Sequence, residues 1–406
     1  MKNNIRVIHT RKYKDVNLYL RFSWTTTAKQ RACSYVLSRL MCEATTVHKT
    51  KESMQRVKDM LYGMSIDVSN RTRCDISSFD VHYSFINPKF VKEPIESYLS
   101  FIDETLHHVL INQKVISEAK RSITSTLKRE NDRPSFFAKE RVIEIVGEEY
   151  EGFKNLSLIK PLLSDIKEVT VKDIKEFYEF LINSAQLHVY VMGDIDENLE
   201  RALTDFGFEG RIKVNTGLVS KVFVEKGEFT DKKKMSQSVL ARVYQTPIDK
   251  KSDDFFAWKI GDYFLGVAPC SLLFEEVREK RSLCYSISAI EYSYHGIVKI
   301  VTSIDASNKD TVLKQIDIQI KRIIDQDYDV KKLDMAKALF VNMLDSISDD
   351  GDGYVDYLFE SEISGFDPDI ERYKQKIMEV TPDHLTRIFK QYKPYFTYML
   401  EGTDHD

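Results

Sequence analysis

The sequence predicts an α+β fold of two homologous halves, each a mostly antiparallel sheet with helices packed on one face. Three sequence matches predict the two halves, because they recur in the same order with offsets of 221, 217 and 211 positions. Such slowly shrinking offsets are typical of a duplication followed by loop deletions. The matches are VNLYLRF from Val16 with QSVLARV from Gln237, VISEAKRSITSTL from Val115 with KLDMAKALFVNML from Lys332, and VTVKDIKEFYEFL…LHVYVMGD from Val169 with VTPDHLTRIFKQY…FTYMLEGT from Val380.

Each half mixes helical and strand periodicity. In the first half, apolar residues recur with helical spacing and then alternate with period two, which predicts helices and half-buried strands. The second half repeats this order. In both halves a short apolar run precedes the first matched strand. The predicted helices are 28–43, 51–62, 94–108, 115–129, 253–265, 310–324 and 332–346, and the predicted strands are 16–22, 65–68, 77–85, 237–243, 283–289 and 297–304.

The predicted boundary between the halves is the segment GRIKVNTGLVS. It has two glycines and little periodicity, which indicates a linker. The predicted divisions are therefore 1–209, a linker at 210–220, and 221–406.

Composition excludes several classes of protein. The 406 residues are 42% hydrophobic and 30% charged with a net charge of −4, which fits a folded chain and argues against a dedicated nucleic-acid binder. The longest stretch without charge, 180–193, is too short to span a membrane. Because MKNNIRVIHTRKYKD lacks the apolar region of a signal peptide, we expect a soluble, cytoplasmic protein.

Familiar catalytic motifs are missing from the sequence. There is no GxxxxGK[ST], GxSxG, HExxH or HxxEH, and the nine histidines are scattered. The five cysteines are odd in number and have no CxxC spacing, which argues against a disulfide framework or a structural zinc site.

The segment SLLFEEVREKRSLCYSISA, residues 271–289, holds the densest chemical signal. Its pattern predicts an amphipathic helix that ends in Lys280 and Arg281, where cations favour the helix dipole, followed by a strand headed by Tyr285. Spacing alone favours a charged helix end and a half-buried tyrosine.

This segment closely resembles the S-x-L-F-x-x-V-R-E-K-x-x-L-x-Y pattern of the pitrilysin/insulinase-type (inverzincin) metallopeptidases. The resemblance extends over most of the chain, through residues 118–144, LHVYVMGDID at 187–196 and the duplication itself. It implies that Arg278 and Tyr285 are substrate-binding residues, since an arginine can hold a substrate carbonyl and a phenol can donate to an oxyanion. The residues that fit are Ser271, Leu273, Phe274, Val277, Arg278, Glu279, Lys280, Leu283 and Tyr285.

One departure from that family decides the expected function. Active members carry HxxEH on the first helix, where two histidines and a later glutamate hold zinc and the motif glutamate is the general base. In ACSYVLSRLMCEATT, the alignment places Ser34 and Ser38 at the histidines and Leu37 at the base, and the later glutamate aligns with Ser125. The resemblance therefore implies a degenerate zinc site and no metal in this chain.

We therefore expect a non-catalytic, substrate-binding subunit of a heterodimeric zinc metallopeptidase. Its partner would be a catalytic subunit of the same family, carrying HxxEH and the zinc. The substrate would be a short or unfolded peptide, such as a ribosomally made peptide or bacteriocin precursor. Two alternatives stay open: a scaffold protein with the same fold and no proteolytic role, and a metalloenzyme with ligands outside the motif.

Overall fold

The computed structural model describes residues 5–206, 222–235, 237–367 and 369–403. Its internal contacts divide the chain into two compact units. The first comprises Met1–Lys128 and Asn155–Thr216, and the second comprises Arg129–Lys154 and Gly217–Asp406. The predicted linker, 210–220, lies outside the described residues, so its role stays a prediction.

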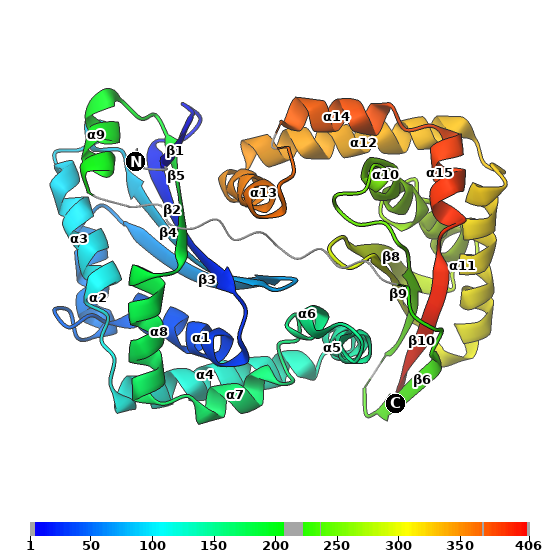
Figure 1. The fold of residues 1–406 in the computed structure, drawn as a ribbon, viewed down its shortest axis with the longest axis horizontal. Helices are drawn as coiled ribbons and strands as arrows, with labels where there is room; N and C mark the ends of the chain where they lie inside the picture. Colours follow the sequence, from blue (N-terminus) through cyan, green and yellow to red (C-terminus); the bar gives the residue numbers. More distant parts are fainter. Residues whose placement is uncertain (1–4, 207–221, 236, 368, 404–406) are drawn as a thin grey trace. The chain divides into compact units, whose positions relative to one another are not determined.

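The described part of the first unit is a five-stranded sheet with helices (Figure 1). The strand order is β1-β5-β2-β4-β3, in which β1 runs parallel to β5 and the other neighbours are antiparallel. The elements are β1 (Ile5–His9), β2 (Asp15–Thr25), α1 (Ala28–Glu43), α2 (Lys51–Met60), β3 (Ser65–Arg73), β4 (Ile76–Ile86), the 3-10 turn η1 (Pro88–Phe90), α3 (Ile95–His107), α4 (Gln113–Asn131), α7 (Leu162–Glu168), α8 (Val171–Asn183), β5 (Gln186–Gly193) and α9 (Glu197–Asp205).

Strand β2 shows how the sequence pattern builds this sheet. Its apolar residues alternate, so that Val16, Leu18 and Leu20 all point to one face, as period two requires. That face joins the core formed with α1, α3 and α8. The opposite face of β2 carries polar side chains such as Asn17 and Arg21.

The second unit repeats this arrangement. Its sheet has the order β6-β10-β7-β9-β8, with β6 parallel to β10 and the other neighbours antiparallel. The elements are α5 (Pro134–Gly147), α6 (Glu151–Lys154), β6 (Gly227–Lys233), β7 (Ser238–Gln245), α10 (Phe255–Gly266), the π-helical turn η2 (Phe274–Glu279), β8 (Cys284–Tyr292), β9 (Ile297–Ile304), the 3-10 turn η3 (Ala306–Asn308), α11 (Lys309–Ile324), α12 (Val330–Asp349), α13 (Gly351–Ser364), α14 (Ile370–Met378), α15 (Pro382–Phe389) and β10 (Lys393–Gly402).

The two strand orders correspond position by position, which confirms the predicted α+β fold of two similar halves. The matched sequences also fall on corresponding elements, since Ala119-Lys120 lies on α4 and Ala336-Lys337 lies on α12. Both alanines are buried. The match from Val169 and the match from Val380 each begin a helix with a threonine capping box, followed by the strand next to the parallel edge.

Helices α5 and α6 belong to the second unit although they come from the N-terminal half of the sequence. On β9, Val298 and Ile300 point into the helical core, so Lys299 points to the opposite face. Helix α5 covers that face, where Glu140 is buried near Lys299 and Arg141 Nε binds the Asp231 carboxylate at 2.8 Å. The second sheet is therefore covered on both faces.

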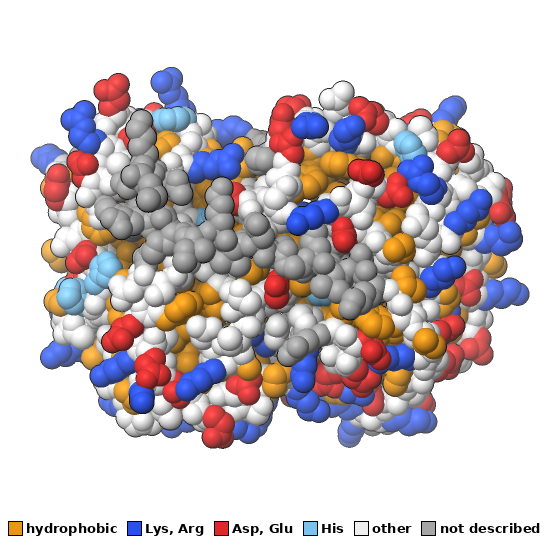
Figure 2. Space-filling model, in the orientation of Figure 1, with side chains coloured by type: hydrophobic (Ala, Val, Ile, Leu, Met, Phe, Trp, Pro, Cys, Tyr) orange, Lys and Arg blue, Asp and Glu red, His pale blue; other side chains and the backbone are white. Residues whose placement is uncertain are grey.

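Two further findings concern the hydrophobicity of the helices and the charge of the surface. No helix among the described residues has the length and apolar character needed to cross a membrane. Figure 2 shows basic and acidic side chains interspersed over the visible face, in line with the small net charge of −4.

Candidate functional site

Tyr285 lies in a β-bulge near the start of β8. The register with β9 shifts between Cys284 and Ile287, which leaves one extra residue on β8. The Thr302 hydroxyl donates to the backbone oxygen of Ser286 at 2.7 Å and holds this irregular segment. Bulges redirect side chains, and Tyr285 is 83% exposed. The half-buried tyrosine expected from spacing alone is therefore wrong.

Arg278 lies on the π-helical turn η2, where the sequence predicts an ordinary amphipathic helix. The backbone N–H of Lys280 donates to the Glu275 oxygen five residues earlier, at 2.9 Å. Such turns are rare and are often found at functional sites. The Arg278 guanidinium carbon lies 4.4 Å from the centroid of the Phe274 ring. This cation–π contact holds the guanidinium over the Phe274 ring.

Ser282 reverses the chain between Arg278 and Tyr285. Its φ of +52° lies in the left-handed region. Its N–H donates to the Arg278 oxygen at 3.1 Å, and the Leu283 N–H donates to the Val277 oxygen at 3.0 Å. These bonds close the helical turn and start β8 directly after it, which brings Arg278 and Tyr285 to the same region.

Arg278 and Tyr285 line one cavity of about 690 Å³ within the second unit. Its walls come from the start of β7, the turn after η2, the start of β8 and the end of β9. Burial raises the pKa of the Cys284 thiol, which disfavours the nucleophilic thiolate. The described lining residues are Gln237, Ser238, Arg278, Ser282, Leu283, Cys284, Tyr285, Ser303, Ile304, Asp305, Ala306, Asn308 and Gly402.

The acidic residues beside Arg278 are paired with other cations. The hydrogen bond from Lys332 lowers the pKa of the Glu275 carboxyl, and the bond to Glu276 raises the pKa of Lys280. The ion pairs are Lys280 with Glu276 at 2.7 Å and with Glu275 at 3.1 Å, Arg322 with Glu276 at 3.5 Å, Arg281 with Glu276 at 4.0 Å, and Lys332 with Glu275.

The residues predicted to replace the zinc ligands do not share one site. Leu37 is fully buried in the core of the first unit, and Ser34 is 2% exposed with its hydroxyl donating to the Arg31 backbone oxygen. Ser125 is exposed on α4. Of these four residues, Ser38 is the one that lines the cavity beside α1, and its hydroxyl donates to the Tyr35 oxygen at 2.9 Å.

That cavity, about 440 Å³ in volume, shows which face of α1 is accessible. It is lined by Tyr35, Ser38, Arg39 and Cys42 from α1, by the start of β3, and by Thr126 from α4. The first three have the i, i+3, i+4 spacing of HxxEH, so the motif frame that faces the cavity is one residue later than the sequence alignment. The alignment of Ser34, Leu37 and Ser38 with the family motif stays a prediction, and the apolar stripe of α1 around Leu37 is the sequence signal for which face of the helix meets the core.

The α1 positions with HxxEH spacing at this cavity do not fit zinc, although Cys42, Glu43 and Asp67 also line it. Tyr35, Ser38 and Arg39 offer two hydroxyls and a cation where two imidazoles and a carboxylate would be required. Among the described residues, no group of three or more His, Cys, Asp or Glu is arranged to hold a metal ion. Serine and leucine at the frame predicted from sequence are equally poor ligands.

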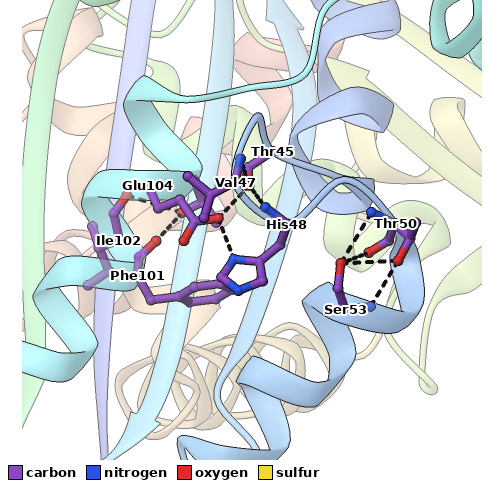
Figure 3. A network of polar contacts seen from close by, with 9 residues as sticks. Thr45, Val47, His48, Thr50, Ser53, Phe101, Ile102 and Glu104 are labelled. Carbon is purple, nitrogen blue, oxygen red and sulfur yellow. Dashed lines mark hydrogen bonds and ion pairs between the residues drawn. The ribbon is translucent and has the colours of Figure 1, made fainter.

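A polar network around Glu104 is structural (Figure 3). It ties the loop after α1 to α3: the buried Thr45 hydroxyl donates to Glu104 Oε1, and His48 Nδ1 lies 2.7 Å from the same oxygen. The backbone N–H of His48 donates to Thr45 Oγ1 at 2.7 Å. Thr50 and Ser53 then form the capping box of α2. All these groups stabilise the loop between α1 and α2, and none of them lines the Arg278 cavity or the α1 cavity.

Two titratable side chains of α10 contact polar partners in the second unit. Burial raises the pKa of Asp262 to about 7, and its Oδ1 accepts a 2.6 Å hydrogen bond from the Tyr392 hydroxyl. Burial lowers the pKa of Lys259 to about 8, and its ammonium contacts the Glu291 carboxylate. These groups hold α10 against α15 and β8.

Comparisons with known proteins find similarity to one peptidase family. Residues 168–340 match the family model described as the M16 peptidase inactive domain. A curated relative, the probable inactive metalloprotease YmfF of Bacillus subtilis (strain 168), is 22% identical over 413 residues, which cover 98% of this chain and 95% of the relative.

Several solved structures share the fold. A conserved protein from Enterococcus faecalis V583 has a TM-score of 0.86 at 21% identity, covering 99% of this chain and 97% of that chain. An M16 peptidase inactive domain from Pseudomonas fluorescens has a TM-score of 0.77 at 15% identity, covering 98% and 96%. A protease from Helicobacter pylori has a TM-score of 0.75 at 15% identity, covering 99% and 98%.

Taken together, the chain is similar in residues 168–340 to the M16 peptidase inactive domain and over nearly its whole length to a probable inactive metalloprotease, and it shares the fold of M16-like structures, in line with the family that the sequence resembles. On α1, neither Ser34, Leu37 and Ser38 nor Tyr35, Ser38 and Arg39 form an HxxEH motif.

Proposed function

We propose that this chain is the non-catalytic, peptide-binding subunit of a heterodimeric zinc peptidase, whose partner is a catalytic HxxEH chain of the same family. The observation that carries the proposal is that Arg278 and Tyr285 line one cavity of the second unit, while the α1 positions with HxxEH spacing in the first unit carry no histidine. A substrate-binding subunit needs only the first of these sites.

The chemistry of the pair suits a peptide bond. A guanidinium presents its N–H donors in one plane and can hold a carbonyl oxygen, and the Phe274 ring contacts the guanidinium of Arg278. The phenol of Tyr285 is exposed and can donate to an oxyanion. The bulge and the π-helical turn support this reading, because both irregularities redirect these two side chains.

The proposed substrate is a short or unfolded peptide, because an extended chain can bring its backbone carbonyl to a cavity. A ribosomally made peptide or bacteriocin precursor fits this description. We also propose a cytoplasmic location, where such precursors are made.

The test combines this chain with an HxxEH-bearing M16 chain from the same genome. With wild-type protein, the mixture should hydrolyse peptides that neither chain cleaves alone. Tyr285→Phe removes one hydroxyl with almost no change in volume, and it should lower kcat about 10²–10³-fold if that hydroxyl donates to the oxyanion. Tyr62→Phe is the matched control, since Tyr62 is also exposed and lies in the first unit.

Arg278→Ala should mainly raise KM, and Arg278→Lys should restore only part of the loss because an ammonium lacks the planar fork. Arg281→Ala is the control for charge, since Arg281 does not line the cavity. The assembly and the Tm of each mutant heterodimer should stay unchanged. If the Arg278→Ala/Tyr285→Phe double variant is fully active, the pair does not bind substrate and the chain is a scaffold.

A further inference from the structure

We propose that the cavity at Arg278 binds a carboxylate of the peptide, either the C-terminal group or an Asp or Glu side chain. This inference rests on the proposed function and adds to it the chemical class of the bound peptide. The juxtaposition that carries it is an arginine without a carboxylate partner inside a polar cavity.

The surroundings of Arg278 make its unpaired state informative. Glu275 and Glu276 lie within three residues, yet their carboxylates bind four other cations, two of which come from α11 and α12. In the described residues, Arg278 has the Phe274 ring as its side-chain contact and no ion pair. The positive charge that these acids could have neutralised therefore stays at the cavity.

The Phe274 contact leaves the donors of Arg278 available. The phenyl ring offers no oxygen acceptor, so this contact pairs none of the five N–H groups of Arg278 with a carboxylate or carbonyl. A carboxylate can accept from two of these donors at once and brings a full negative charge to the guanidinium, whereas a carbonyl oxygen is neutral. The geometry of Arg278 thus favours a carboxylate over an amide.

The rest of the lining fits a small polar anion. Hydroxyls from Ser282 and Ser303 and the amide of Asn308 line the same cavity and can donate hydrogen bonds. Asp305 is the one acid among the described lining residues, and its Oδ1 already accepts bonds from the Ser307 N–H at 2.8 Å and the Ser307 hydroxyl at 2.6 Å. These bonds disperse the charge of Asp305 and hold it at the start of η3.

The test measures binding of fluorescent octapeptides to the full chain alone. One sequence is used in four forms: neutral with a C-terminal amide, neutral with a free C-terminus, amidated with one internal Glu, and amidated with Gln at that place. At least one carboxylate form should bind about tenfold or more tightly than its neutral match. The free-acid arm and the Glu arm identify which carboxylate is bound.

Variants assign that preference to Arg278. Arg278→Ala should abolish it, Arg278→Lys should keep part of it, and Arg281→Ala should leave it intact. Asp305→Asn keeps the acceptor for Ser307 and removes a negative charge, so it should strengthen binding of the carboxylate forms only. The preference should also shrink as salt rises.

Two results would overturn the inference, and they differ in what else they overturn. If all four peptides bind equally and Arg278→Ala weakens them equally, Arg278 holds a carbonyl, so the carboxylate inference fails and the proposed function stands. If no peptide binds to the chain or to its reconstituted heterodimer, both fail.

Discussion

The ammonium of Lys120 on α4 donates to the backbone oxygen of Lys167 at 2.7 Å, at the end of α7. In the second unit, the ammonium of Lys337 on α12 contacts the oxygen of Met378 at the end of α14, at 3.5 Å. Both acceptors come two residues before a valine-threonine pair that begins the next helix, so the Ala-Lys matches in the sequence preserve the same tertiary bond in both halves.

Replacing either Lys120 or Lys337 should remove the corresponding hydrogen bond and lower the free energy of unfolding. Lys120→Met leaves the carbonyls of Lys167 and Val169 without this donor, and Lys337→Met does the same to Met378. A bond from a charged donor contributes about 1.5–3 kcal/mol, so each variant should lower the free energy of unfolding by about 1–3 kcal/mol in urea titrations.

The matched control for that pair is Lys114→Met, because Lys114 is exposed on α4. It should change the unfolding free energy by less than about 0.5 kcal/mol. Equal stabilities of all three variants would contradict a shared structural role for Lys120 and Lys337.

Periodicity was enough to predict the helices and strands that build each core. The predicted helix 28–43 coincides with α1, and the predicted strand 77–85 lies within β4, because local apolar spacing determines both. The likeness of the two sheets followed from the duplication, since three matched segments recur in the same order, whereas the strand order itself was not predicted.

Features that depend on distant residues were not predictable from the sequence. The attachment of α5 and α6 to the second sheet depends on contacts such as Arg141 with Asp231, which are 90 positions apart. The bulge at Tyr285 depends on the pairing with β9. Which residues of α1 have HxxEH spacing and also face a cavity depends on which side of the helix meets the core. Shifting the alignment by one residue turns the motif by about 100° around the helix.

Restoring a zinc site should distinguish the two frames on α1. Tyr35→His, Ser38→Glu and Arg39→His together with Thr126→Glu place HxxEH and a third ligand on residues that line one cavity. After dialysis against zinc, elemental analysis should find about one zinc per chain, because two imidazoles and a carboxylate form a normal zinc set.

The control for that design uses the frame aligned from sequence. Ser34→His, Leu37→Glu, Ser38→His and Ser125→Glu should retain no zinc, since Leu37 is fully buried and Ser125 is exposed on α4. The buried glutamate should also lower stability by several kcal/mol. Stoichiometric zinc in this variant and none in the first would reverse the assignment of the frame.

The polar network at Glu104 should stabilise the fold by holding the loop after α1 against α3. Glu104→Ala removes the acceptor of the buried Thr45 hydroxyl and of His48, so it should lower the free energy of unfolding by about 1–3 kcal/mol. Glu104→Gln keeps an oxygen acceptor and should lose less. Glu96→Ala, an exposed change on the same helix, should stay within about 0.5 kcal/mol.

His295 should make the chain less stable in acid. It is 2% exposed in the turn between β8 and β9, among the rings of Tyr150 and Phe153 at 5.6 and 4.9 Å, and its Nε2 has no hydrogen-bond partner among the described residues. Burial lowers its pKa from 6.5 to about 4. Between these two values the unfolded chain binds a proton that the folded chain does not bind, so stability falls as the pH falls from about 6.5 toward 4.

His295→Phe removes that titration and keeps an aromatic ring in the turn. We compare its free energy of unfolding in urea with that of the wild type at pH 7.5 and pH 5. Relative to wild type, the variant should gain about 2 kcal/mol on moving to pH 5, because the proton then has no site in the unfolded chain at position 295. Groups that titrate in the opposite sense, such as Asp262 with its raised pKa, contribute to both proteins and cancel. His107→Gln, at an exposed histidine, should show no such gain, and an equal gain there would mean that burial at His295 is not the cause.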